Sequence, residues 1–229
     1  MRNEEDLLPY FLRYYSTFAD KIFIIDVKST DKTIEIAKAN KKVRLLDYKF
    51  PEGIDEEMQS RCFEKCYKKY SRGVADWVMA VDGDEFVYNK DLVAVLKEQQ
   101  RLGRRVIKTT GYMMYSEAFP TTKGQIYKEC YLGARSRLYD KKIVFDPLID
   151  LKFMGGRHET ILPVGVGCFR AKILLLHYRY LSLDSSIKRL YNSPHRFYNK
   201  KLIRNIKIAL DRYEYGVASI KNGELIKVL

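Results

Sequence analysis

An apolar run at residues 77–81 ends in two carboxylates one residue apart, Asp82 and Asp84, and it limits the fold more than any other segment. Such a run is typical of a strand buried on both faces, and ligands of open α/β sheets lie outside the carboxyl ends of these strands. Two carboxylates there suit Mg²⁺ or Mn²⁺ shared with a phosphorylated substrate. A plain polar turn is the alternative, because Asp and Gly are common turn residues.

Apolar runs and helical patterns alternate along the first half of the chain. Strands are expected at 21–26, 43–47, 76–81, 106–115, 136–145 and 171–180. Helices are expected at 33–40, 55–70 and 91–101, after a first helix capped by Asn3. This order predicts an α/β fold with a mostly parallel central sheet and flanking helices. We expect one domain, 1–183, and a basic helical C-terminal extension, 184–229.

The chain has 229 residues and a formal net charge of +13, which calls for an anionic partner. Nucleic acid, an anionic membrane surface and a nucleotide are the candidates. The zinc-finger, helix-turn-helix and RNA-binding aromatic motifs are all missing, so nucleic acid is disfavoured. The sequence also has no apolar run long enough to span a membrane and no signal-peptide pattern. We therefore expect a cytoplasmic protein, with peripheral membrane contact through its basic extension.

Three short motifs occur together in a recognisable order. They are Arg-Asn-Glu-Glu at 2–5, Ile-Ile-Asp at 24–26 with Ser-Thr-Asp-Lys-Thr at 29–33, and the segment 77–86. Their order and spacing resemble family-2 glycosyltransferases with the GT-A fold and an Asp-x-Asp motif. The resemblance covers about the first 90 residues well and continues more thinly through 156–159 and 177–180. Two departures are that Met1 directly precedes Arg2, where relatives have an initial strand, and that Val27-Lys28 replaces a small pair.

The resemblance implies a metal-dependent, inverting glycosyltransferase. It would move a sugar from a nucleotide diphosphate sugar, UDP-linked, to a glycan, lipid-linked or protein acceptor. Residues 1–103 would form a nucleotide-binding half and 104–183 an acceptor half. Asp84 would bind Mn²⁺ or Mg²⁺ directly, and Asp82 would hold the ribose or a metal-bound water. A late histidine often completes the metal shell in this fold, which leaves His177 and His158 as alternatives.

The remaining site residues follow from the same resemblance and from position. Asp26 would accept a hydrogen bond from the nucleotide base, with Asn3 and Glu4 lining that pocket, and Gly83 of the Asp-x-Asp turn would also bind the nucleotide. Glu85 is expected to orient this turn. Arg61 either pairs with a phosphate or is an exposed helix charge.

An inverting reaction needs a carboxylate that takes the acceptor's proton. Glu159 is our first choice because it follows a Gly-Gly-Arg-His loop, and Asp150 and Asp146 compete with it. His195, in the basic extension, is expected at the surface.

Two other functions remain in view. A nucleotidyltransferase would also hold Mg²⁺ with paired acids, but it would show a Gly-rich phosphate loop near its first strand, which is missing. A basic adaptor for nucleic acid or a membrane surface would use the cationic stretch 188–212.

Overall fold

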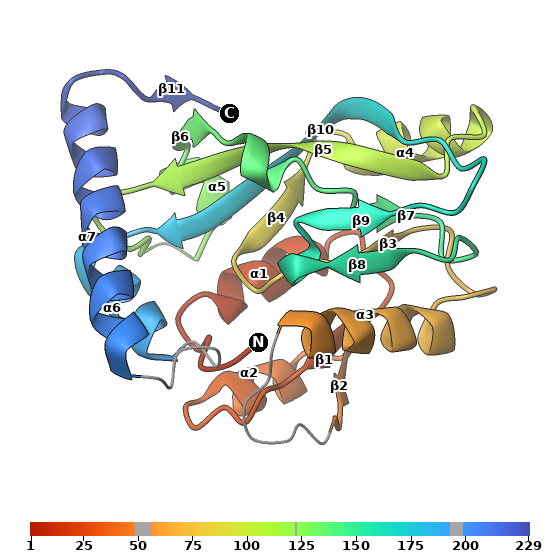
Figure 1. Cartoon of the computed structure of the whole chain (residues 1–229), viewed down its shortest axis with the longest axis horizontal. Helices are drawn as coiled ribbons and strands as arrows, with labels where there is room; N and C mark the ends of the chain where they lie inside the picture. Colours follow the sequence, from red (N-terminus) through yellow and green to blue (C-terminus); the bar gives the residue numbers. More distant parts are fainter. Residues whose placement is uncertain (49–55, 122, 193–198) are drawn as a thin grey trace. The chain divides into compact units, whose positions relative to one another are not determined.

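The computed structural model describes residues 1–48, 56–121, 123–192 and 199–229 (Figure 1). The chain forms two units, each built from separate stretches. Unit 1 comprises Met1–Gly53, Met113–Ala134 and Tyr178–Leu229, and unit 2 comprises Ile54–Tyr112 and Arg135–His177. The predicted boundaries at 103 and 183 stay predictions.

Unit 1 begins with a parallel βαβ element. Strand β1 (Ile22–Ile25) pairs in parallel with β2 (Val43–Leu46), with Ile22 opposite Val43, and helix α2 (Thr33–Ala39) connects them. A parallel pair requires such a crossover connection. The backbone of Met1 runs beside β1, because its amino group donates to Ile25 O and its carbonyl accepts from Val27 N–H.

The first helix, α1 (Leu8–Tyr15), starts later than the sequence predicted. Asn3 does not cap it, since Asn3 has a left-handed backbone with φ of 52° and its side chain bonds to Thr30 instead. Pro9 lies in the first turn of α1, where its missing N–H costs no hydrogen bond. Aromatic side chains then form an edge-to-face cluster, which comprises Phe11, Tyr14, Tyr15, Phe18 and Tyr127.

The rest of unit 1 is mostly helical. It contains α5 (Ile126–Glu129), β6 (Leu132–Arg135, whose last residue is in unit 2), α6 (Leu183–Asn192), α7 (Asn199–Lys221) and β11 (Ile226–Lys227). Helix α7 packs closely on Tyr115, because a Cβ added at Gly216 would lie 2.1 Å from the Tyr115 ring. The helical character expected from residue 184 onward is confirmed at 184–192 and 199–221, whereas residues 226–227 form the short strand β11. None of the helices in the described residues is long and apolar enough to cross a membrane.

Unit 2 carries most of the strands. Its elements are α3 (Glu56–Tyr70), β3 (Val78–Met79), β4 (Glu85–Tyr88), α4 (Leu92–Arg101), the 3₁₀ turn η1 (Arg137–Tyr139), β7 (Val144–Phe145), β8 (Lys152–Met154), the 3₁₀ turn η2 (Gly155–Arg157) and β9 (Glu159–Ile161). Strands β5 (Val106–Tyr115) and β10 (Phe169–Tyr180) pass from one unit into the other.

The core of unit 2 centres on Tyr67 of α3. Its ring packs edge to face on Phe145 and Phe153. Its hydroxyl donates to Ile149 O at 3.1 Å and accepts from Leu151 N–H at 3.0 Å, so the buried oxygen is satisfied. This core fixes α3 against strand β8.

The prediction of a mostly parallel central sheet is wrong. The larger sheet has the order β11-β6-β5-β10-β4, with β7 joining β3 and β5, and the pairs β4–β10, β3–β7, β5–β7 and β6–β11 are antiparallel. The apolar run that predicted a buried parallel strand at 76–81 forms only the two-residue β3, which leads by a tight turn into β4. In the described residues, β1 and β2 form a parallel pair that is joined by a helix.

The strand expected at 136–145 is also wrong in part. This segment forms η1 and then the short β7. By contrast, the strand expected at 106–115 is confirmed, and the helices expected at 33–40, 55–70 and 91–101 are confirmed to within a residue at each end.

Candidate functional site

The turn between β3 and β4 presents the two carboxylates found in the sequence. Glu85 N–H donates to Asp82 O at 3.1 Å, and Asp82 N–H donates to Glu85 Oε2 at 3.1 Å. Gly83 is buried at the centre of this turn. Strand β4 then pairs with β10, which places Glu85 opposite His177.

A buried ion pair between Lys141 and Glu85 holds the turn in place. Lys141 Nζ lies 2.5 Å from Glu85 Oε1, and the two side chains are 2% and 0% exposed. The Lys141 segment is held to β5, since Thr109 N–H donates to Lys141 O at 3.0 Å. Glu85 therefore orients the turn, as expected, by binding Asp82 N–H with one oxygen and Lys141 with the other.

Asp84 lies beside His177. The distance from Asp84 Oδ2 to His177 Nε2 is 3.3 Å, and both side chains are nearly buried. The ring of Tyr139 packs on the His177 ring with 4.2 Å between centroids. The structure thus brings together one of the two predicted histidines and the predicted metal-binding carboxylate.

His158 occupies a different position. Its Nδ1 lies 3.2 Å from Leu138 O, and its ring contacts the Tyr139 ring at 5.7 Å. Burial and the nearby charge of Lys141 lower the pKa of His158, which favours the neutral ring. Tyr139 therefore contacts both histidines, and only His177 is paired with Asp84.

Gly111 of β5 determines where Tyr139 can lie. A Cβ at position 111 would be 2.4 Å from the backbone carbon of Tyr139, so only glycine allows this approach. Gly111 O accepts from Ser136 N–H, and Gly111 N–H donates to Asp140 Oδ1, both at 3.0 Å. These bonds on either side of Tyr139 fix the ring that packs on His177.

Asp140, which accepts from Gly111 N–H, is itself held by two arginines. Burial alone would raise the pKa of Asp140, but hydrogen bonds from Arg135, Arg170 and Gly111 N–H hold it well below its ordinary value. A carboxylate with two guanidinium partners stays ionised at neutral pH. Asp140 is therefore a structural anion next to the Tyr139 segment.

Asp84 and His177 are the two predicted metal-binding side chains that lie together. Among the described residues, no group of three or more His, Cys, Asp or Glu side chains is assembled to hold a metal ion. Asp84 and His177 do fit two neighbouring positions of one shell, because ligands about 2.1 Å from an octahedral cation at right angles lie about 3 Å apart. His177 Nδ1 is buried without a hydrogen-bond partner in the described structure, whereas ligating histidines usually donate from this atom. Asp84 and His177 therefore provide two ligand positions, and no third protein ligand joins them among the described residues.

Asp82 has a partner that the sequence interpretation missed. Arg157 Nη2 lies 2.5 Å from Asp82 Oδ1, and the Arg157 side chain is 1% exposed, whereas that of Asp82 is 46% exposed. The guanidinium carbon also lies 4.0 Å from the centroid of the Phe63 ring. Burial would raise the pKa of Asp82, but the charges of Arg157 and Lys141 lower it overall.

Arg157 also has a strained backbone, with φ of 65°. A non-glycine residue in this region costs roughly 1–2 kcal/mol, so the surrounding structure must hold it there. The Gly-Gly pair before Arg157 was the available sequence signal, since glycines allow the sharp turn that precedes it.

Two of the three candidate general bases, Asp150 and Glu159, differ in their surroundings. Asp150 pairs with Arg72 at 2.8 Å and Lys68 at 3.0 Å, and hydrogen bonds from these two residues lower its pKa. A carboxylate stabilised in this way is a weak base. Glu159 is exposed on β9, opposite Met154 of β8.

Two other predicted residues are surface groups or lie in surface pairs. Arg61 pairs with Glu57 one turn earlier on α3 and is 63% exposed, which agrees with the exposed-charge alternative. Asp146 pairs with Arg105 at 2.9 Å. His195 lies outside the described residues.

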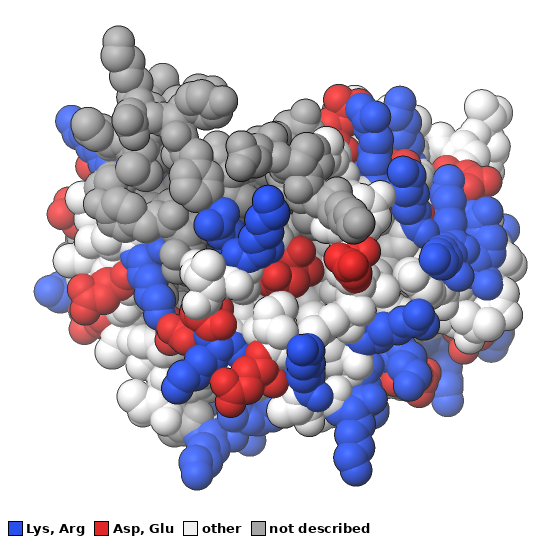
Figure 2. Space-filling model, turned by 90° about the horizontal axis from the view of Figure 1, so that it is seen from below, with Lys and Arg blue, Asp and Glu red and all other residues white. Residues whose placement is uncertain are grey.

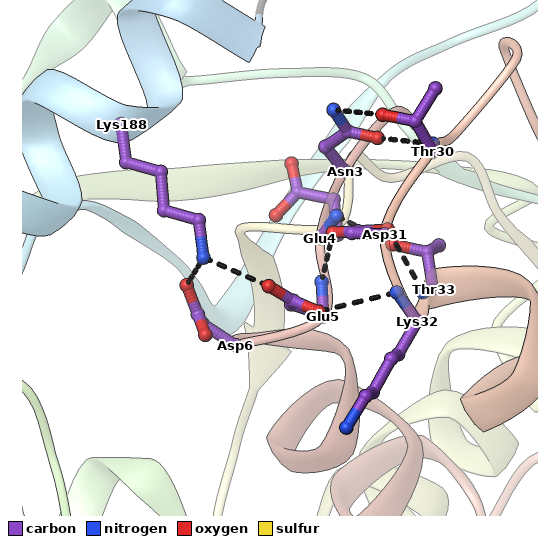
Figure 3. A network of polar contacts seen from close by, with 9 residues as sticks. All are labelled: Asn3, Glu4, Glu5, Asp6, Thr30, Asp31, Lys32, Thr33 and Lys188. Atoms are coloured by element: carbon purple, nitrogen blue, oxygen red, sulfur yellow. Dashed lines mark hydrogen bonds and ion pairs between the residues drawn. The ribbon is translucent and has the colours of Figure 1, made fainter.

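Unit 1 holds the other predicted residues, Asn3, Glu4 and Asp26, and Figure 3 shows the polar network around Asn3 and Glu4. Asn3 Oδ1 accepts from Thr30 N–H at 2.8 Å, and Glu4 N–H donates to Thr33 Oγ1 at 2.7 Å. Asp26 is bound to Ser29, whose N–H and hydroxyl both donate to its carboxylate. Asn3, Glu4 and Asp26 are thus joined to one connected turn, 26–33.

The same network extends to helix α6. Lys188 Nζ donates to Asp6 Oδ2 at 2.7 Å and to Glu5 Oε1 at 3.0 Å (Figure 3). These contacts raise the pKa of Lys188, through the hydrogen bond to Asp6 above all. Part of the basic C-terminal charge is therefore neutralised within unit 1. On the face in Figure 2, Lys and Arg side chains are spread widely, with Asp and Glu between them.

Comparison with known proteins shows proteins of similar fold but does not assign the chain to a family. No protein-family model and no curated protein matches the chain. The crystal structure of S. aureus TarS 1–349 in complex with UDP is similar, with a TM-score of 0.51 and 11% identity, and covers 93% of this chain and 69% of that chain. A second TarS 1–349 structure gives a TM-score of 0.50 with the same identity and coverage. At this identity the likeness shows the mixed α/β fold alone.

Proposed function

We propose that this chain is a metal-dependent, inverting glycosyltransferase with a GT-A-like site that uses a UDP-linked sugar donor. The observation that carries the proposal is the Asp84–His177 pair at the strand-end turn of unit 2. Its support is the similarity of the fold to a protein that was crystallised with UDP. The acceptor is a glycan, a lipid-linked sugar or a protein.

Asp84 and His177 are the proposed ligands of Mn²⁺ or Mg²⁺. Mg²⁺ is commonly held by one or two carboxylates together with substrate phosphates, and Mn²⁺ accepts an imidazole. When bound, the cation would stabilise the negative charge that develops on the leaving diphosphate. His158 is not part of this proposal, because it bonds to Leu138 O.

The reaction breaks the bond between the anomeric carbon and the diphosphate oxygen and forms one to the acceptor oxygen. The acceptor's proton must pass to a base, and Glu159 keeps this proposed role because it is exposed, whereas Asp150 is paired with Arg72 and Lys68. Glu159→Gln should lower kcat with little change in donor KM. Asn3, Glu4 and Asp26 remain predicted nucleotide-binding residues.

Calorimetric titration of UDP with and without MnCl₂ tests the proposal. Mn²⁺ should increase the affinity of wild type for UDP. The increase should be at least tenfold smaller in Asp84→Asn. Asp76→Asn is the matched control, since Asp76 is an exposed carboxylate of the same unit, bonded to Gln100. A screen of nucleotide sugars for Mn²⁺-dependent hydrolysis then identifies the donor. Absence of metal-dependent UDP binding by wild type would overturn the proposal.

A further inference from the structure

Contacts in the described structure offset only part of the cost of burying Arg157. Its side chain is 1% exposed, yet none of its three guanidinium nitrogens makes a hydrogen bond within the described residues. Its polar contacts there are the ion pair with one oxygen of Asp82 and the face of the Phe63 ring. A guanidinium has five N–H donors, and buried donors are nearly always satisfied in folded proteins.

An acceptor with several oxygens would satisfy the Arg157 guanidinium. A planar guanidinium binds carboxylates and phosphates through two parallel hydrogen bonds, and Asp82 supplies only one close contact. The Phe63 ring holds one face of the guanidinium, which leaves its edge to bind an acceptor in the plane. A second positive charge, that of Lys141, also acts on Asp82.

The solvent-exposed carboxylate of Asp82 marks the place where an acceptor could reach Arg157. Its carboxylate is 46% exposed, so the ion pair has one buried member and one member in contact with solvent. An incoming anion can therefore replace Asp82 on the guanidinium without unfolding the η2 turn. Asp82 would then be free to bind another group of the ligand.

We propose that Arg157 is a diphosphate-binding residue that exchanges Asp82 for phosphate oxygens when a nucleoside diphosphate binds to unit 2. The identity of this ligand rests on the proposed function, whereas the anion site rests on Arg157 alone. The exchange makes Asp82 a competitor of the diphosphate in the absence of metal. Loss of the Asp82 charge should therefore tighten anion binding, which is the opposite of what a purely metal-binding Asp82 predicts.

Calorimetric titration with inorganic diphosphate, in EDTA, measures this site directly. Wild type should bind, Arg157→Met should bind at least tenfold more weakly, and Arg157→Lys should be intermediate. Asp82→Asn should bind at least threefold more tightly than wild type. Arg101→Met is the control, because Arg101 is exposed and pairs with Glu98 on α4.

Folding is checked by the thermal midpoint of each variant with and without diphosphate. Asp82→Asn leaves Arg157 unpaired, so diphosphate should raise its midpoint more than that of wild type. This comparison decides the question even where Arg157→Met does not fold. An Asp82→Asn affinity equal to or weaker than wild type, or an unchanged Arg157→Met affinity, would overturn the exchange.

Titration with UDP separates this inference from the proposed function. Arg157-dependent binding of inorganic diphosphate without binding of UDP supports the anion site and refutes the donor. Mn²⁺-dependent binding of UDP that is unaffected by Arg157→Met refutes the anion site and leaves the glycosyltransferase proposal standing.

Discussion

Replacing Lys141 with Met should destabilise unit 2 strongly and disturb the carboxylate turn. Met matches the length of the lysine side chain but leaves Glu85, which is fully buried, with an uncompensated charge. At 2.5 Å and an effective dielectric constant of 20, the attraction between the two charges is roughly 7 kcal/mol. Desolvation of both ions offsets most of this, but removing one partner from a buried pair still costs about 3–5 kcal/mol.

The double variant Lys141→Met, Glu85→Gln separates charge from packing. It removes both charges at similar side-chain volume. Its free energy of unfolding should therefore lie within about 2 kcal/mol of that of wild type. Lys97→Met on the exposed face of α4 is the matched control and should change stability by no more than about 0.5 kcal/mol.

Urea unfolding followed by tryptophan fluorescence is the appropriate assay. Trp77, the single tryptophan of the chain, directly precedes β3 and so reports on unit 2. The pair does not anchor the turn if Lys141→Met lowers the free energy of unfolding by less than about 1 kcal/mol. The same conclusion follows if the single and double variants lower it equally.

Three further changes have defined outcomes. Gly111→Ala should cost about 1–3 kcal/mol and weaken Mn²⁺-dependent UDP binding, because the new Cβ would displace Tyr139, and calorimetry with urea unfolding measures both effects. The pKa of Asp140 is lowered in the folded protein, so its stabilisation is complete above about pH 4 and is lost as the pH falls further. Thermal midpoints measured against pH should therefore show a shallower acid-side decline in Asp140→Asn, and an unchanged slope would contradict this role. Gly216→Ala should lower the midpoint of unit 1 by overpacking Tyr115, as circular dichroism would detect, whereas Gly223→Ala, which meets open space but has φ of 68°, reports backbone strain alone.

Local patterns in the sequence predicted the elements well. The helices at 33–40, 55–70 and 91–101 and the strand at 106–115 were correct because each depends on a period that the local chain carries. The sheet was wrong because parallel and antiparallel pairing differ in which distant strands meet. The run 77–81 is equally apolar in both cases, and only its pairing with β7 shows the direction.

The candidate site shows the same division. The sequence identified Asp82 and Asp84 as carboxylates after an apolar run, and the motif resemblance identified His177. It missed Arg157 and Lys141, because the burial of a charged residue depends on contacts made far along the chain. It also ranked Asp150 as a base, although Arg72 and Lys68 pair with that carboxylate.

The sequence by itself determined that two carboxylates would follow a short apolar strand, because an apolar run followed by Asp-Gly-Asp permits little else. Tertiary structure decided what each carboxylate does. Asp84 is paired with His177, Asp82 with a buried arginine, and Glu85 with a lysine 56 residues away. The reason is physical: a carboxylate's charge, pKa and ligand preference depend on burial and on the charges within a few ångströms, and antiparallel pairing brings those charges from distant parts of the chain.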